Sequence, residues 1–192
     1  KGLHPSPIMP QGEQIEYSLF RPAKPYLDPI TRRLLGFKAT LVGYAELIAG
    51  GEPATIVLTG ITAGVKKEDK VLINNSPEFD LYFAPSVPDT QVQGLIIELI
   101  ASGMPTGTTQ GAVGSIVVLN IGAESGLKAG DVLGVYAKSR RVIDPKNHLL
   151  SIQLPAERIG EALVFRPFTK TSFALIVRST HAVYLLDTVT NP

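Results

Sequence analysis

One stretch, from Gly114 to Tyr136, constrains the fold more than any other part of the chain; it reads GSIVVLNIGAESGLKAGDVLGVY. Residues 115–119 are rich in β-branched side chains, which favour the pleated, half-buried surface of a strand. The run 120–122 contains residues that adopt turn conformations, so we expect the strand to end there. Gly130–Asp131 is a second turn pair, and residues 132–136 start another strand. The stretch predicts two strands joined by a turn and a short connection, with no catalytic chemistry.

The rest of the chain shows the same pattern, in which short strand-like runs alternate with turns that contain glycine or proline. Hydrophobic residues make up 44% of the 192 residues and charged residues 18%, so a folded core is expected. We predict an all-β protein of two small, related barrel or sandwich modules with almost no helix, the exception being one turn at 155–158. Glu98 interrupts the apolar run 93–100, and we expect it to face solvent at a sheet edge.

The two halves of the chain carry the same order of features at nearly the same spacing. Each has an Asp-Pro pair, a glycine, two strand-like runs and a closing aspartate. A duplicated β unit is the simplest account, and chance similarity within an all-β chain is the alternative. We therefore divide the chain into an extended linker (1–25), a first β module (26–90) and a second β module (91–192). The matching positions are Asp28, Gly43 and Asp69 in the first half and Asp144, Gly160 and Asp187 in the second.

Composition argues against several classes of function. The net charge of +1 gives no electrostatic basis for binding nucleic acid or an anionic membrane surface. The chain has no cysteine, which excludes disulfides, thiolate zinc sites and a cysteine nucleophile. No apolar run approaches the roughly 20 residues that a helix needs to span a bilayer. We predict no cofactor, no nucleic-acid partner and no transmembrane segment.

Residues able to carry chemistry are present, but they form no recognisable catalytic pattern. The aspartates fall in predicted turns, where a carboxylate bonds backbone N–H groups, and we favour that role over an acid/base pair. The histidines are far apart and lack the HxxxH or HExxH spacing of metal sites. We predict no catalytic residue and no metal ligand, and therefore no enzyme. The residues considered are Asp28, Asp69, Asp131, Asp144, Asp187, His4, His148 and His181.

Three segments resemble a known family, the proteobacterial LysM-containing, peptidoglycan-binding envelope proteins. GSIVVLNIGAESGLKAGDVLGVYAKSRRVIDP is similar to a block of that family in which Asn-x-Gly, Gly-Leu and Gly-Asp pairs follow a strand. LPAERIGEALVFRPFTKTSFALIVRSTHAVYLLDTV resembles the block that follows, and YLDPITRRLLGFKA resembles the middle region of the family. The resemblance covers most of the chain after about Arg21, and it implies a periplasmic or cell-wall-associated protein.

The resemblance also implies a partner, because the LysM module of the family binds glycan that contains N-acetylglucosamine. That module would precede this chain, with Lys1–Pro10 as the connecting linker, and none of its glycan-binding residues falls on a position of this sequence. We therefore expect a non-catalytic envelope module that acts as a spacer or protein-interaction scaffold, with an envelope protein as a further partner.

Two alternatives stay open. The chain could bind glycan in its own right, through a stacking surface formed by aromatic side chains, although it contains no tryptophan. A cell-wall hydrolase whose carboxylates converge only in three dimensions is the less favoured alternative. The aromatic residues selected for the stacking surface are Tyr26, Tyr44, Tyr82 and Phe83.

Overall fold

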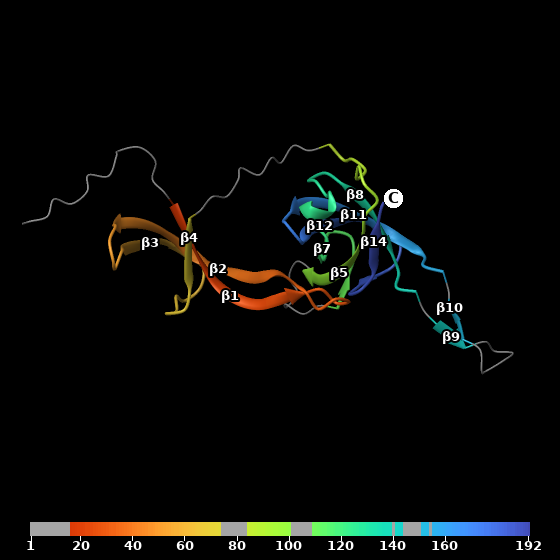
Figure 1. Ribbon diagram of the computed structural model, residues 1–192, viewed down its shortest axis with the longest axis horizontal. Helices are drawn as coiled ribbons and strands as arrows, with labels where there is room; N and C mark the ends of the chain where they lie inside the picture. The colour runs from red at the N-terminus through yellow and green to blue at the C-terminus, as the bar shows by residue number, and fades with distance from the viewer. Residues whose placement is uncertain (1–15, 74–83, 101–108, 140, 144–150, 154) are drawn as a thin grey trace, which may run out of the picture. The chain divides into compact units, whose positions relative to one another are not determined.

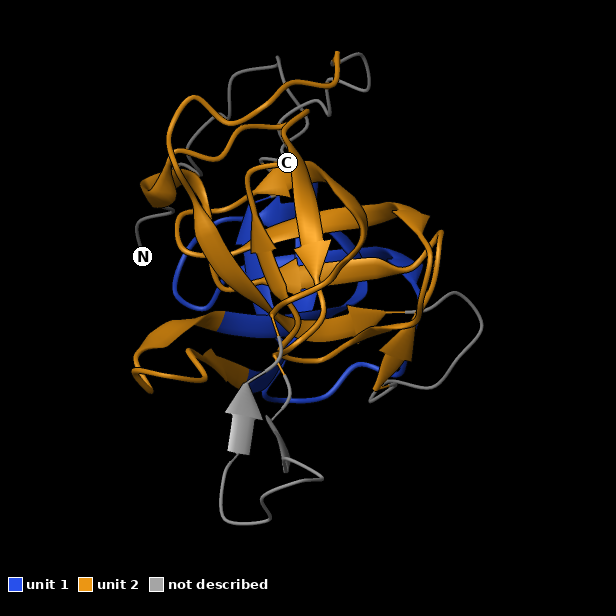
Figure 2. Ribbon diagram, turned by 90° about the vertical axis from the view of Figure 1, so that its right-hand side faces the viewer, with its two compact units in different colours: residues 1–24, 37–79 blue, residues 25–36, 80–192 orange. Residues whose placement is uncertain are grey.

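The computed structural model describes residues 16–73, 84–100, 109–139, 141–143, 151–153 and 155–192. Within those residues the protein consists of strands and one 3₁₀ turn, η1 (Ala123–Ser125), which confirms the all-β prediction (Figure 1). The chain forms two compact units, residues 1–24 with 37–79 (unit 1) and residues 25–36 with 80–192 (unit 2), shown in different colours in Figure 2. The strands are β1 (Glu16–Leu27), β2 (Leu34–Ala49), β3 (Thr55–Ile61), β4 (Lys70–Ile73), β5 (Gln93–Ile100), β6 (Gln110–Gly111), β7 (Ile116–Leu119), β8 (Val132–Tyr136), β9 (Arg141–Ile143), β10 (Ser151–Gln153), β11 (Arg158–Pro167), β12 (Ser172–Ser179), β13 (Val183–Tyr184) and β14 (Thr188–Thr190).

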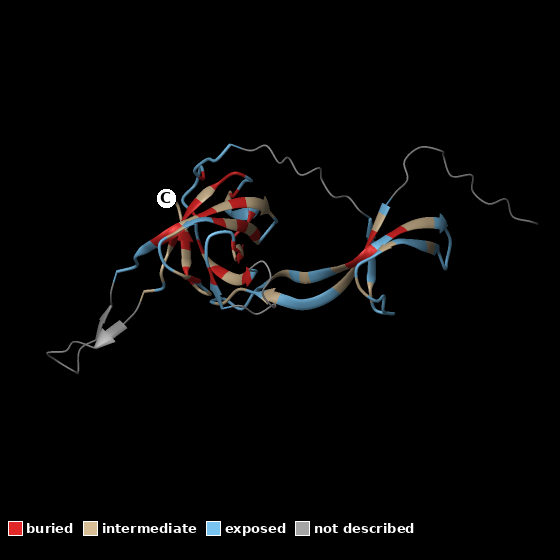
Figure 3. Cartoon of the chain, turned by 180° about the vertical axis from the view of Figure 1, so that it is seen from behind, coloured by how far each residue is buried: buried red, intermediate tan, exposed pale blue. Residues whose placement is uncertain are grey.

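Unit 2 is built around a closed barrel of six strands in the order β11-β12-β7-β5-β14-β8. All neighbouring strands are antiparallel, and closure leaves the barrel without free edges. Alternate side chains along each strand point inward and form one apolar core, visible as the red bands in Figure 3. Its fully buried members include Ile96, Leu119, Leu133, Ile176 and Val189.

Unit 1 is a single sheet with the order β3-β2-β1-β4. Its buried core is small, consisting of Leu19, Val42 and Ala45, and much of the sheet is exposed (Figure 3). β4 pairs with β1 over Tyr17–Phe20, and no described strand pairs with the later part of β1 on that side. Pro22 and Pro25 both lie beyond the part of β1 that pairs with β4.

The hairpin tip between β1 and β2 belongs to unit 2. Asp28 builds this turn, because its Oδ1 accepts hydrogen bonds from the backbone N–H groups of Ile30 (3.0 Å) and Thr31 (2.7 Å). The same carboxylate accepts a bond from Asn120 Nδ2 (2.8 Å) at the end of β7, and the Tyr26 hydroxyl donates to Glu98 on β5. These polar contacts attach the tip to the barrel.

Three expectations from the sequence differ from the structure. Glu98 is half-buried and lies on a strand between β7 and β14, so its predicted place at a sheet edge is wrong; the Tyr26 hydroxyl is one of its partners. The helical turn at 155–158 is also wrong, because Arg158 begins β11 by pairing with Tyr136. Residues 16–25, which we assigned to a linker, form most of β1. The hairpin tip, which we assigned to the first module, belongs to unit 2 together with the barrel.

The sheet of unit 1 has the same strand order as four consecutive barrel strands, β12-β11-β8-β14. The positions of the shifts in pairing register also correspond. On β2 the shifts follow Tyr44 and Leu47, and on β11 they follow Glu161 and Val164. What the barrel has in addition is β7 beside β12 and β5 beside β14. In unit 1 the strands in the corresponding positions, β3 and β4, are the ends of the sheet.

Candidate functional site

Three turns of the molecule are built in the same way around an aspartate that directly precedes a strand. Asp69 Oδ2 accepts a hydrogen bond from the N–H three residues earlier, that of Lys66, at 2.7 Å. Asp131 and Asp187 do the same with residues 128 (2.8 Å) and 184 (2.7 Å). In each case the aspartate N–H returns a bond to the carbonyl of that earlier residue. The prediction that these aspartates form turns is confirmed for all three; Asp144 lies outside the described residues.

The turn at Asp69 is closed by an arginine from β1. Arg21 donates from Nε to Asp69 Oδ1 (2.9 Å), and from Nη2 to Asp69 Oδ2 (2.8 Å) and the Gly64 carbonyl (2.7 Å). The Asp69 side chain is only 2% exposed. The Arg21 hydrogen bond, followed by the Lys66 amide, holds the pKa of Asp69 below its ordinary value.

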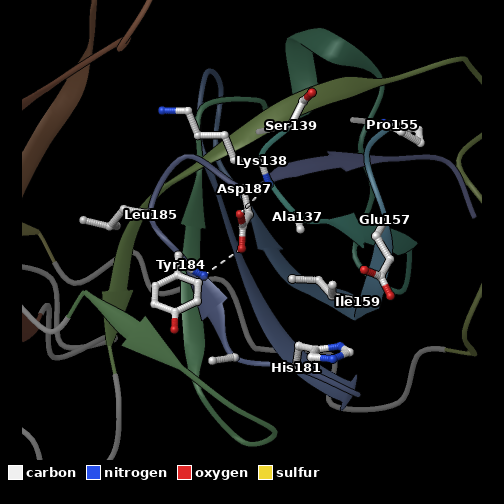
Figure 4. A pocket seen from close by; sticks show the side chains of 11 residues that line it. Ala137, Lys138, Ser139, Pro155, Glu157, Ile159, His181, Tyr184, Leu185 and Asp187 are labelled. Carbon is white, nitrogen blue, oxygen red and sulfur yellow. Dashed lines mark hydrogen bonds between the residues drawn. The ribbon is translucent and has the colours of Figure 1, made fainter. Parts of the chain in front are cut away.

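The turn at Asp187 borders a cavity of about 660 Å³ in unit 2 (Figure 4). The volume lies within the range of roughly 300–1,000 Å³ typical of ligand pockets. Asp187 is 3% exposed, and its Oδ1 accepts a bond from the Lys138 N–H at 2.9 Å. The lining contains both polar and apolar side chains, and their burial ranges from exposed to buried. The lining residues are Ala137, Lys138, Ser139, Pro155, Glu157, Ile159, His181, Ala182, Tyr184, Leu185 and Asp187.

The cavity combines a buried anionic group with apolar walls. Figure 4 shows the Asp187 carboxylate among the lining side chains, and dashed lines mark the hydrogen bonds that it accepts from the N–H groups of residues 184 and 138. Glu157, Lys138 and His181 are exposed charged or titratable groups of the lining. Among the described residues, no cluster of three or more His, Asp or Glu side chains is suited to hold a metal ion. The arrangement can hold a cation, because the buried Asp187 carboxylate borders an open space.

The aromatic residues selected from the sequence have different settings. Tyr26 belongs to unit 2 and bonds Glu98, and burial, followed by that bond, raises the pKa of its hydroxyl. Tyr44 belongs to unit 1 and is 40% exposed. Tyr82 and Phe83 lie outside the described residues. The stacking surface therefore stays a prediction.

A second candidate is the open sheet of unit 1. Val71 on β4 is 41% exposed, whereas Val189, at the corresponding place on β14 two residues after its aspartate, is fully buried. Likewise Leu58, opposite Ala45 on β2, is 37% exposed, whereas Ile176, opposite Ala162 on β11, is fully buried. Sequence analysis missed this difference, because both runs have the same apolar pattern.

No protein-family model matches the chain, and no curated protein is significantly similar to it. The class that the fold defines is an all-β protein with a closed six-stranded barrel and a separate open sheet. No helix in the described part of the chain has the length and apolar character needed to cross a bilayer.

Proposed function

We propose that this chain is a non-catalytic module of the cell envelope, periplasmic or cell-wall associated, that accompanies an upstream peptidoglycan-binding LysM domain. Its role is that of a spacer and protein-interaction scaffold. The observation that carries the scaffold role is the open sheet of unit 1, in which Val71 and Leu58 are exposed where the barrel buries their counterparts.

The open sheet supports an interaction by strand addition. Among the described strands, β3 and β4 are the two ends of the sheet, and the backbone N–H and C=O groups of an end strand can pair with a further strand. In the barrel, β7 and β5 pair with β12 and β14, and their inward side chains belong to the core that contains Ile176 and Val189. A partner that contributes a β-hairpin with alternating apolar residues would complete unit 1 in the same way.

We also propose that the two units arose by duplication of one β unit. The shared strand order, the shared positions of the register shifts on β2 and β11, and the turns at Asp69 and Asp187 support this proposal. Gly43 and Gly160 add to it, because a Cβ at either position would lie 2.3 or 2.4 Å from a backbone oxygen of the neighbouring strand. A glycine is required at both places for the same steric reason.

The chemistry of the aspartates supports a non-catalytic role. Asp69, Asp131 and Asp187 each direct a carboxylate oxygen to a backbone N–H of their own turn. A carboxylate used in this way stabilises the loop before a strand, and a general acid or base would need a hydrogen-bond path to a substrate instead.

Co-sedimentation with insoluble peptidoglycan tests the proposal. We expect the 192-residue chain to stay in the supernatant, to sediment when a LysM module is fused before Lys1, and to release no soluble glycan fragments in either form. Sedimentation of the chain alone, abolished by Tyr44→Ala, would instead establish the glycan-binding alternative. Release of soluble fragments by the chain would establish a hydrolase and overturn the proposal.

A further inference from the structure

Unit 1 and unit 2 contain two versions of the same turn, one filled by a side chain and the other hollow. On β1, Phe20 pairs with Lys70, the residue after Asp69. On β8, Tyr136 pairs with Thr188, the residue after Asp187. The residues that follow on the first strand of each pair are Arg21 and Ala137. These two residues therefore occupy the same position relative to their aspartates.

In unit 1 the guanidinium group of Arg21 fills this position. It makes two parallel bonds to the carboxylate of Asp69, and one of its nitrogens also bonds the carbonyl of Gly64, five residues before the aspartate. The planar fork of an arginine matches the two oxygens of a carboxylate, which makes this a strong charge-assisted pair.

In unit 2 the same position is hollow, because alanine replaces arginine. Ala137 lines the cavity together with Asp187 and with Ala182, which stands five residues before the aspartate as Gly64 does. The Asp187 oxygens accept the N–H groups of residues 138 and 184. Each carboxylate oxygen can accept more than one hydrogen bond, as Asp69 Oδ2 does in unit 1.

We propose that the cavity beside Asp187 binds a guanidinium group, namely an arginine side chain presented by a partner polypeptide. The carboxylate supplies the counter-charge, and exposed Glu157 adds a second one at the lining. Tyr184 and Leu185 also line the cavity, and their apolar surface can contact the methylene stem of the arginine. Among the described lining residues, Lys138 and His181 are the basic side chains, and the positive charge of Lys138 disfavours further positive charges on the partner beside the arginine.

Arginine fits this site better than lysine does. A buried carboxylate is costly to pair with a strongly hydrated ammonium, whereas a guanidinium is more weakly hydrated and satisfies several acceptors at once. The site in unit 1 uses these properties, because Arg21 bonds Asp69 and a carbonyl together. This inference deepens the proposed scaffold role, since it names what the barrel recognises on its partner.

Nuclear magnetic resonance titration of the full chain with methylguanidinium and with Nα-acetylarginine amide tests the site directly. We expect saturable shifts of the amide signals of residues 138, 184 and 187, at least about tenfold weaker for methylammonium and Nα-acetyllysine amide, as expected when a bidentate pair is lost. Ala137→Arg should fill the cavity with the chain's own arginine, abolish the response and raise the Tm. An equal response to both cations, or an unchanged response in Ala137→Arg, would overturn the proposal.

The converse substitution gives an independent readout in unit 1. Arg21→Ala hollows out the turn at Asp69, so we expect a lower Tm that methylguanidinium restores in part and methylammonium does not. A drop in Tm that neither cation restores would count against a guanidinium-selective turn. Guanidinium binding and sedimentation with peptidoglycan are measured separately, so this inference and the proposed function can fail independently.

Discussion

Alanine substitutions at Ile176 and Leu58 compare corresponding positions in the closed barrel and the open sheet. Ile176 is fully buried, so its removal leaves a cavity in a packed core and should cost roughly 2–5 kcal/mol. Leu58 is 37% exposed. If full burial of a leucine is worth about 1.5–3 kcal/mol, the part that is buried here predicts a cost of about 1–2 kcal/mol, with no closed cavity to add to it. The two substitutions should therefore differ by about twofold or more.

Urea unfolding is followed through the amide signals of each unit, which measures the two costs separately. The measurement is therefore valid even if the two units do not unfold together. Val57→Ala is the matched control, because Val57 precedes Leu58, is 43% exposed and points to the other face of β3. Its cost should be no larger than that of Leu58→Ala. If Leu58→Ala costs as much as Ile176→Ala, while Val57→Ala costs little, the face is covered in solution and the open-sheet argument is refuted.

Three further comparisons test a close backbone contact and two hydrogen-bonded side chains. Gly160→Ala would place a Cβ 2.4 Å from a β12 backbone oxygen and should cost roughly 1–3 kcal/mol in unfolding experiments, whereas Gly36→Ala, with no atom within 4 Å of the added Cβ, should be nearly neutral. The pKa of the Tyr26 hydroxyl is raised in the folded state, so its contribution to folding stability is complete below the ordinary tyrosine pKa of about 10 and declines as pH rises above it. In alkaline titration, the stability of the wild type should therefore fall more steeply than that of Tyr26→Phe. The lowered pKa of Asp69 has the opposite sign: its stabilisation is present above about pH 4 and is lost as pH falls further, so the Tm difference between wild type and Arg21→Ala should shrink in acid.

The strands were the most predictable part of the fold. Residues 132–136 form β8 with the predicted bounds, and the apolar run 93–100 forms β5, because runs of this kind between turn residues carry a local signal. The turn role of Asp28 and Asp187 was predictable for the same reason, since each carboxylate bonds N–H groups within three residues.

Closure of the barrel was not predictable in detail, and Glu98 shows why. The run 93–100 reads as an edge strand because of its charge, but β14 from the end of the chain pairs with one side of β5 and β7 pairs with the other. The Tyr26 hydroxyl, which donates a hydrogen bond to Glu98, comes from a hairpin tip that is distant in sequence. Contacts of this range leave no trace in local pattern, since tertiary packing overrides propensity.

The cavity beside Asp187 depends on a comparison that sequence spacing alone does not provide. Aligning the aspartates shows that both turns are alike, but the register of β1 with β4 and of β8 with β14 is needed to place Arg21 and Ala137 at the same position. In unit 1, the Arg21 side chain donates hydrogen bonds to the Asp69 carboxylate. In unit 2, Ala137 leaves the buried Asp187 carboxylate beside an open space. We therefore propose that a turn of this kind serves only the fold in unit 1 and is also a recognition site in unit 2, where Ala137 leaves open the position that Arg21 fills and the Asp187 carboxylate can still accept a cation.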